Sequence, residues 1–249
     1  MKALVRSELL KQRTTRTTGL LFLWMAGLVA LIVLLHVSTL KAANLSPQDG
    51  QLKVLGWGTG IGALFASILG ALSITAEFRH GTIRPTLLAA PKRARVVAAK
   101  LLASGLAGLA VGVLAEGFTA ALETAGLAAR GIHISLTGGD FAQLLGGGAV
   151  AAGLFAAIGV GIGAAVRNQI GTIIGLCVWN LLIETTLIGN IPSAGKFTPG
   201  AAAGAIAGAL QTADRSDLIT PALGFLLLAA YALAAAGLGA RTITRRDIA

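Results

Sequence analysis

Charged side chains are scarce in this sequence. Asp, Glu, Lys and Arg make up 12% of the 249 residues, whereas a soluble domain carries about 25%. Hydrophobic residues make up 55%, and the mean hydropathy is +0.81. A soluble domain of this length has too much surface to hide so much apolar material. We therefore expect most of the chain to be surrounded by lipid.

Cysteine and aromatic residues are also rare. Cys177 is the only cysteine, so the chain cannot form an internal disulfide, and aromatic residues make up 5%. A formal net charge of +10 would suggest a nucleic-acid partner in a soluble protein. Aromatic side chains are too few here for a surface on which bases stack. We therefore assign the charge to the cytoplasmic loops of a membrane protein and expect no nucleic acid as partner.

Patterns typical of an active site are missing from the sequence. His36, His80 and His133 lie in three separate regions, without the spacing of zinc ligands. The nearest approach to a phosphate-binding loop, NIPSAGKF, has Asn190 in place of the first glycine and Phe197 in place of the Ser or Thr after lysine. We therefore expect no catalytic residue, no metal and no cofactor or nucleotide bound by this chain.

Six apolar stretches are long enough to cross a membrane, which takes about 20 residues in a helix. The sequence therefore predicts an all-α membrane protein, and the absence of a linker predicts a single domain over residues 1–249. The third stretch would be about 48 Å long as a helix, so it must tilt, protrude or break. The predicted spans are residues 19–40, 54–76, 96–127, 141–166, 170–191 and 219–240.

Lys and Arg are distributed unevenly between the two ends of these spans. With the N-terminus in the cytoplasm, fifteen of the twenty Lys and Arg residues lie inside and five outside. Such a bias marks the cytoplasmic side, so we expect both termini in the cytoplasm. The first apolar run is longer than the core of a signal peptide, so we interpret it as an uncleaved span.

Two other segments are predicted to lie at the membrane surfaces. In residues 1–18, Val5 and Leu9 can form an apolar stripe on a helix among basic residues, which favours an amphipathic helix along the inner leaflet over a disordered tail. Between the fifth and sixth spans, Pro192 and Pro199 interrupt an apolar segment that is too short to cross. This pattern predicts re-entrant half-helices in the outer leaflet.

Three carboxylates lie within the predicted spans, where each costs about 2.5–3.5 kcal/mol near the bilayer centre. Glu116 and Glu184 fall in the outer half. They either line the outer part of a substrate path, or reach toward the outer surface or pair with Arg130 or Lys196. For Glu123 we expect the side chain to reach the outer surface or to pair with Arg130.

Glycines recur at four-residue spacing within the spans. Small residues at this spacing let helices approach closely in lipid. The rows fit either a subunit interface or packing within one subunit, and the sequence leaves both open. They are Gly58, Gly62, Ala66 and Gly70; Gly159 and Gly163; and Gly171 and Gly175.

The loop between the second and third spans, within TAEFRHGTIRPTLLAAPKRARVVAAK, combines six Lys and Arg residues with two prolines. Gly81 permits a turn, Pro85 suits the first position of a short helix, and Pro91 would end that helix. Lys100 is expected to reach the lipid headgroups. A short helix with exposed leucines, held below the membrane by charged stems, predicts a docking partner.

This loop resembles that of the ABC-2 type permeases, the membrane subunits of bacterial ABC exporters. The stretches EFRHGTIRPT and PKRARVVAAK carry the resemblance, and the basic N-terminus, the six spans and the Pro199-Gly200 segment agree with it. It implies a homodimer or heterodimer of permeases in the bacterial cytoplasmic membrane, bound to separate ABC ATP-binding subunits that hydrolyse Mg-ATP. The cargo would be lipophilic or amphiphilic, such as a drug, a peptide antibiotic or a lipid.

The resemblance also implies roles for individual residues. Residues 85–90 would form a coupling helix, and residues 77–82 its anchor. Docking on the ATP-binding subunit would involve Glu77, Arg79, Gly81, Thr82, Arg84, Pro85, Leu87, Leu88 and Pro91. The translocation path or outer gate would involve Glu116, Glu184, Pro199 and Gly200.

Two other functions stay open at this point. An ion-coupled secondary transporter would use Glu116 and Glu184 as proton carriers. Such transporters are expected to have paired broken helices in internal repeats, and the sequence shows only one broken segment. A non-transporting immunity or sensor protein would anchor its partners at the membrane without moving a substrate.

Overall fold

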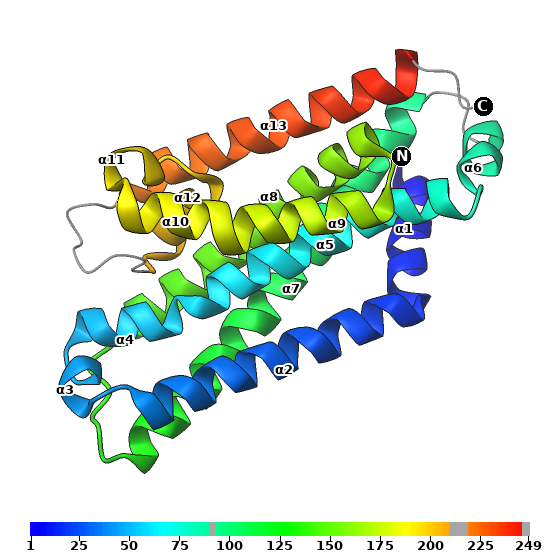
Figure 1. The fold of residues 1–249 in the computed structure, drawn as a ribbon. Helices are drawn as coiled ribbons and strands as arrows, with labels where there is room; N and C mark the ends of the chain where they lie inside the picture. Colours follow the sequence, from blue (N-terminus) through cyan, green and yellow to red (C-terminus); the bar gives the residue numbers. More distant parts are fainter. Residues whose placement is uncertain (90–92, 210–218, 246–249) are drawn as a thin grey trace.

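Figure 1 shows the fold in a computed structural model, which describes residues 1–89, 93–209 and 219–245. These residues are helical or lie in turns and loops, and none forms a strand. Within them, six helical segments are long and apolar enough to cross a membrane, which confirms the predicted class and the six spans. The spans are α2 (Arg16–Thr39), α4 and α5 (Gln48–Leu55 and Trp57–Arg79), α7 (Arg93–Ala129), α8 (Gly138–Val166), the fifth span (Gln169–Asn190) and α13 (Pro221–Arg245).

Three of the spans form the centre of the bundle. In the spans that contain α5, α7 and α8, at least half of the most apolar stretch is buried inside the protein. In α2, the fifth span and α13, less than a third of that stretch is buried. In Figure 1, α2 runs along one edge of the bundle and α13 along the opposite edge. The peripheral helices therefore present most of their apolar side chains outward, where lipid tails are as apolar as leucine.

Glycine lets the central helices α5 and α8 approach each other closely. A methyl group on Gly70 of α5 would collide with the backbone of Ala156 in α8, and one on Gly159 of α8 would collide with the backbone of Ser67 in α5. No flexible side chain could move aside at either point, because the obstacle is backbone. These glycine rows therefore pack helices within one subunit.

The glycine row of the fifth span differs from the other rows. Gly171 and Gly175 are both exposed, and a methyl group on Gly175 would meet open space. This row therefore takes no part in packing within the subunit.

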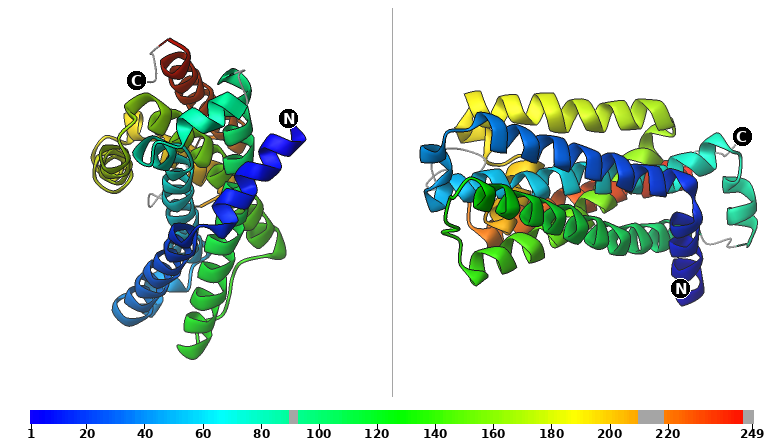
Figure 2. Two further views of the ribbon diagram at one scale, coloured as in Figure 1. Left: turned by 90° about the vertical axis from the view of Figure 1, so that its right-hand side faces the viewer. Right: turned by 90° about the horizontal axis from the view of Figure 1, so that it is seen from below.

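Short helices lie at both ends of the bundle. Short helices between the fifth and sixth spans were predicted, whereas α3 was not; the re-entrant position of the former in the outer leaflet stays a prediction. Figures 1 and 2 show the two ends. One end carries α3 (Ala42–Leu45), α4, α11 (Pro192–Gly195) and α12 (Pro199–Ala207), and the other end carries α1 (Lys2–Thr14) and α6 (Ile83–Ala89).

The third span, α7, is one unbroken helix of 37 residues. At 1.5 Å per residue it is about 55 Å long, well beyond the hydrocarbon layer of about 30 Å. Its surplus length lies partly at the α1–α6 end, where it follows α6 in the chain. The short turn after α8 is formed by Arg167, whose φ of 58° is left-handed.

The substitution Gly159→Ala is expected to lower the thermal stability of the protein. The added methyl group forces α5 and α8 apart, and overpacking of this kind costs about 1–3 kcal/mol. Thermal unfolding of the purified protein in detergent measures the effect. Gly175→Ala is the matched control and should leave the melting temperature unchanged or slightly raised, since alanine favours helix. Equal melting temperatures for the two variants would contradict the close α5–α8 contact.

Candidate functional site

Helix α1 crosses the end of the bundle at a steep angle to the spans (Figure 2). Thr15, in an extended conformation, separates it from α2. Glu8 and Gln12 are the buried side chains of α1, whereas Val5 and Leu9 are half-buried. The prediction of a helix is confirmed. Polar contacts with α5 and α7 hold α1 on the bundle, and its position along a membrane leaflet stays a prediction.

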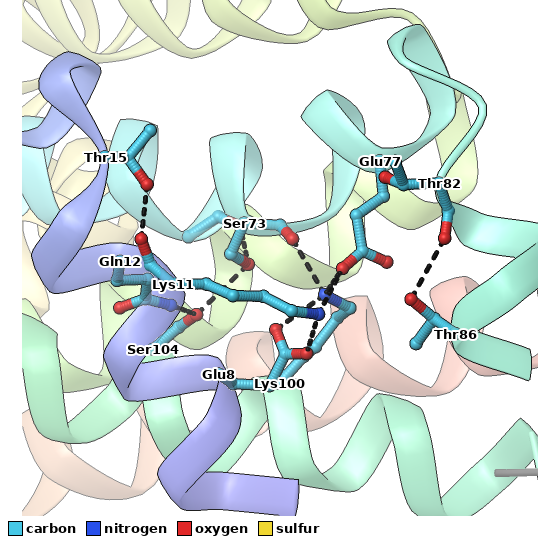
Figure 3. Close-up of polar contacts among 11 residues, drawn as sticks. Glu8, Lys11, Gln12, Thr15, Ser73, Glu77, Thr82, Thr86, Lys100 and Ser104 are labelled. Atoms are coloured by element: carbon cyan, nitrogen blue, oxygen red, sulfur yellow. Dashed lines mark hydrogen bonds and ion pairs between the residues drawn. The ribbon is translucent and has the colours of Figure 1, made fainter. Parts of the chain in front are cut away.

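Lys100 of α7 lies at the centre of these contacts (Figure 3). Its fully buried ammonium group donates to Glu8 at 2.7 Å, to Glu77 at 2.8 Å and to the backbone carbonyl of Ser73 at 2.9 Å. A lysine ammonium has three N–H donors, and each one finds an acceptor here. The prediction that Lys100 reaches the lipid headgroups is wrong, because its partners lie inside the protein.

Lys11 of α1 completes the site from the surface. Its ammonium donates to Glu8 at 2.7 Å and to Glu77 at 2.9 Å, and its side chain is 47% exposed. We call Glu8, Lys11, Glu77 and Lys100 the charge cluster. Two ammonium groups and two carboxylates balance each other, which is how charges are tolerated in a buried position.

A chain of neutral hydrogen bonds runs beside the charge cluster (Figure 3). The amide of Gln12 donates to the hydroxyl of Ser104 at 2.9 Å, and that hydroxyl donates to the hydroxyl of Ser73 at 3.1 Å. Each of the three helices thus contributes two polar residues four positions apart, which places both on one face. The pairs are Glu8 and Gln12 on α1, Ser73 and Glu77 on α5, and Lys100 and Ser104 on α7. This spacing is the signal by which the sequence could have revealed the site.

The charge cluster shifts the pKa values of its two α1 members. Burial by itself raises the pKa of Glu8, but the ammonium groups of Lys100 and Lys11 outweigh burial and hold this pKa below its usual range. Burial likewise tends to lower the pKa of Lys11, and the hydrogen bonds to Glu8 and Glu77 outweigh it and raise this pKa. Both groups are therefore stabilised in their charged forms.

Beyond the charge cluster, α6 follows a turn at Gly81, whose φ of 68° only glycine adopts readily. The helix begins at Ile83, two residues earlier than predicted, so Pro85 occupies its third position instead of the first. Proline is tolerated there because the first N–H groups of a helix lack partners inside it. Ile83 is buried, whereas the side chain of Leu88 is 84% exposed.

The remaining residues predicted for docking occupy the same end of the protein. Arg79 and Thr82 are exposed, between the end of α5 and the start of α6. Arg84 and Leu87 lie on α6. Pro91 lies outside the described residues, so the predicted end of the short helix is not described.

Glu116 is fully buried where α7 meets α5 and α8. The hydroxyl of Thr59 donates to its Oε2 at 2.9 Å. A methyl group on Gly58 would collide with this carboxyl group, and one on Gly148 of α8 would touch it. Among the described residues, Oε1 of Glu116 has no hydrogen-bond partner. A role in a substrate path stays a prediction.

Glu123 pairs with a residue of α2 that lies 87 positions earlier in the chain. Its Oε1 lies 2.5 Å from Nδ1 of His36 on α2. Arg130 instead donates to the backbone carbonyl of Leu40, just after α2, at 2.8 Å. The expectation that Glu123 reaches the surface or pairs with Arg130 is therefore wrong. Both contacts fasten the C-terminal end of α2 to α7.

Glu184 is brought into contact with the predicted gate segment. It is buried, and the backbone N–H of Gly200 donates to its carboxylate. Pro199 is the first residue of α12, so this contact lies at the N-terminus of that helix. The hydrogen-bond partner of Glu116 is instead Thr59 on α5. A gate or path formed by these four residues stays a prediction.

Comparison with known proteins identifies no family: no family model matches the chain, and no curated protein matches it. In the described part of the chain, no group of three or more His, Cys, Asp or Glu side chains could hold a metal ion. The fold and composition establish a multi-span helical membrane protein.

The substitution Lys100→Ala should detach α1 and destabilise the protein. It leaves Glu8 and Glu77 buried without their shared ammonium, and breaking a buried ion pair in this way costs about 3–5 kcal/mol. Thermal unfolding in detergent measures the loss of stability. Arg95→Ala, at an exposed position on the same helix, should have little effect. Equal melting temperatures for the two variants would contradict the central role of Lys100.

A variant that removes the three buried charges together is a second test of the central role of Lys100. Glu8→Gln, Glu77→Gln and Lys100→Met in one chain should be more stable than Lys100→Ala alone, because no buried charge is left without a partner and the half-exposed ammonium of Lys11 can reach water.

The attachment of α1 should depend on pH in a defined direction. The lowered pKa of Glu8 contributes stability that is present above its usual value of 4.5 and is lost as the pH falls through the lowered pKa. The raised pKa of Lys11 contributes stability that is present below 10.5 and is lost as the pH rises through the raised pKa. An environment-sensitive dye on Ser7→Cys, with Cys177→Ala, should report attached α1 near neutral pH and release in acid. Glu8→Gln should abolish the acid transition, and an unchanged transition would contradict this account.

Proposed function

We propose that the chain is the permease subunit of an ATP-driven exporter of the ABC-2 type, moving a lipophilic or amphiphilic compound out across the cytoplasmic membrane. The observation that carries the proposal is helix α6 with its exposed Leu88. Exposed leucines on the spans can face lipid, whereas Leu88 lies on the connection between α5 and α7, at the end of the bundle (Figure 1). A docked protein subunit would cover it.

The charge cluster provides a route from α6 into the membrane. α6 lies between α5 and α7 in the chain, and both of these helices contribute to the cluster close to their α6 ends. A displacement of α6 would therefore move Glu77 and Lys100. Their ion pairs with Glu8 and Lys11 would transmit this movement to α1. From α1 the displacement would pass Thr15 to α2, the first span.

The remaining parts of the exporter would come from other chains. A separate ATP-binding subunit would bind and hydrolyse Mg-ATP, because this sequence has no complete phosphate-binding loop. A second permease, identical or different, would complete the membrane part. The exposed row of Gly171 and Gly175 on the fifth span would allow the close helix contact that such a pair needs.

One observation favours a second candidate function, ion-coupled transport. Glu116 is fully buried with one oxygen lacking a hydrogen-bond partner among the described residues. An intramembrane carboxyl group in this situation is a candidate proton carrier. The two functions differ in whether transport requires an ATP-binding subunit.

The substitution Leu88→Asp should abolish binding of the ATP-binding subunit. A charged carboxylate would have to be buried in an apolar contact, which is unfavourable without a partner. The tagged full-length protein is purified from its native membranes in mild detergent, and an ATP-binding subunit is identified by mass spectrometry and by ATP hydrolysis. Ala42→Asp introduces the same charge at an exposed position on the opposite end of the bundle and should leave binding intact.

If no ATP-binding subunit copurifies in several detergents, the exporter proposal fails and ion-coupled transport becomes the leading candidate. If the subunit copurifies equally with Leu88→Asp, the exporter proposal stands but α6 is not the docking element.

A further inference from the structure

The fifth span is interrupted by a wider turn. It consists of α9 (Gln169–Val178), a π-helical turn η1 (Trp179–Ile183) and α10 (Glu184–Asn190). At the end of η1, the backbone N–H of Glu184 donates to the carbonyl of Trp179, five residues earlier. Single π-turns are rare inside α-helices and recur at functional sites.

Two polar side chains of the span satisfy carbonyl groups around η1. The amide of Asn180 donates to the carbonyl of Leu176 at 2.9 Å, and the hydroxyl of Thr185 donates to the carbonyl of Asn180 at 3.3 Å. Such partners matter in lipid, where a carbonyl left unpaired is costly. The sequence of this segment therefore supports the wider turn.

The π-turn decides which residue faces the interior. The buried face of α9 is marked by Thr172 and Leu176. At about 100° per residue, a regular helix would turn Glu184 about 120° away from Thr172, and would place Ile183 within about 20° of it. The extra residue in the π-turn reduces the rotation of the following residues about the helix axis by roughly 100°. As a result Glu184 is buried and Ile183 is 42% exposed.

The inward carboxylate of Glu184 meets the N-terminus of α12. The N–H of Gly200 donates to it, and a methyl group on Gly200 would lie 2.8 Å from the carboxyl carbon. The N-terminus of a helix carries a partial positive charge, so a carboxylate there is favourable. α12 itself is an almost wholly buried, alanine-rich helix that packs against α13, α8 and α5.

We propose that η1 is a hinge and Glu184 a latch: the π-turn holds the carboxylate on α12, and its conversion to regular α-helix presents Ile183 instead and releases the N-terminus of α12. Ile183 offers no acceptor to the N–H of Gly200, so the α-helical form leaves α12 less firmly held. The proposal concerns the end of the bundle opposite α6 and does not depend on an ATP-binding partner.

Cysteine accessibility in open membrane fragments tests the latch. In a Cys177→Ala background, Ala201→Cys on α12 is expected to react slowly with a water-soluble maleimide, since this position is 6% exposed. Adding Glu184→Ala should raise the rate about tenfold or more, because a charge-assisted hydrogen bond is lost. Glu184→Gln keeps the acceptor without the charge and should give an intermediate rate. Ile174→Ala, an exposed truncation on the same span, should leave the rate unchanged.

Deletion of Leu182 tests the hinge separately. One residue fewer allows an unbroken α-helix that still directs Glu184 inward, eleven positions after Thr172, so the latch can no longer turn away. The Ala201→Cys rate should then fall several-fold below that of the parent. A rate equal to the parent, or a deletion variant that does not fold, would overturn the hinge. A Glu184→Ala rate equal to the parent would overturn the latch.

Discussion

An ammonium group that no water reaches holds together three helices from distant parts of the chain. Lys100 has three N–H donors, and Glu8, Glu77 and the carbonyl of Ser73 accept one each. Without these acceptors the buried charge would be strongly unfavourable. These hydrogen bonds of Lys100 therefore fix where α1 lies relative to α5 and α7. Through the chain they also position the start of α2 and the ends of α5 and α7 that flank α6.

The other buried carboxylates in the described residues are accommodated by equally specific partners. Glu123 has the imidazole of His36, Glu184 has the N-terminus of α12, and Glu116 has the hydroxyl of Thr59. In lipid a polar group must find its partner inside the protein. Each carboxylate thus joins two helices of the bundle.

Away from these polar contacts, close packing of helix backbones holds the centre of the bundle together. α5 and α8 meet backbone to backbone at Gly70 and Gly159, which leaves little freedom of movement. α2 and the fifth span are mostly exposed and have few buried side chains. The closely packed centre therefore differs from the more exposed helices around it, which polar contacts attach at both ends of the bundle.

The sequence by itself determined the class of the protein, its six spans, the short helices before the last span and the turn at Gly81. These follow from hydropathy, helix length and the backbone preferences of proline and glycine, which act locally. The tertiary structure alone decided that Lys100 is buried and that Glu123 pairs with His36, because each partner lies far away in the chain. It also decided that Glu184 faces α12, since a single π-turn changes the register by roughly 100°. Hydropathy counts a residue as polar wherever it stands, whereas burial depends on whether folding brings a matching donor or acceptor beside it.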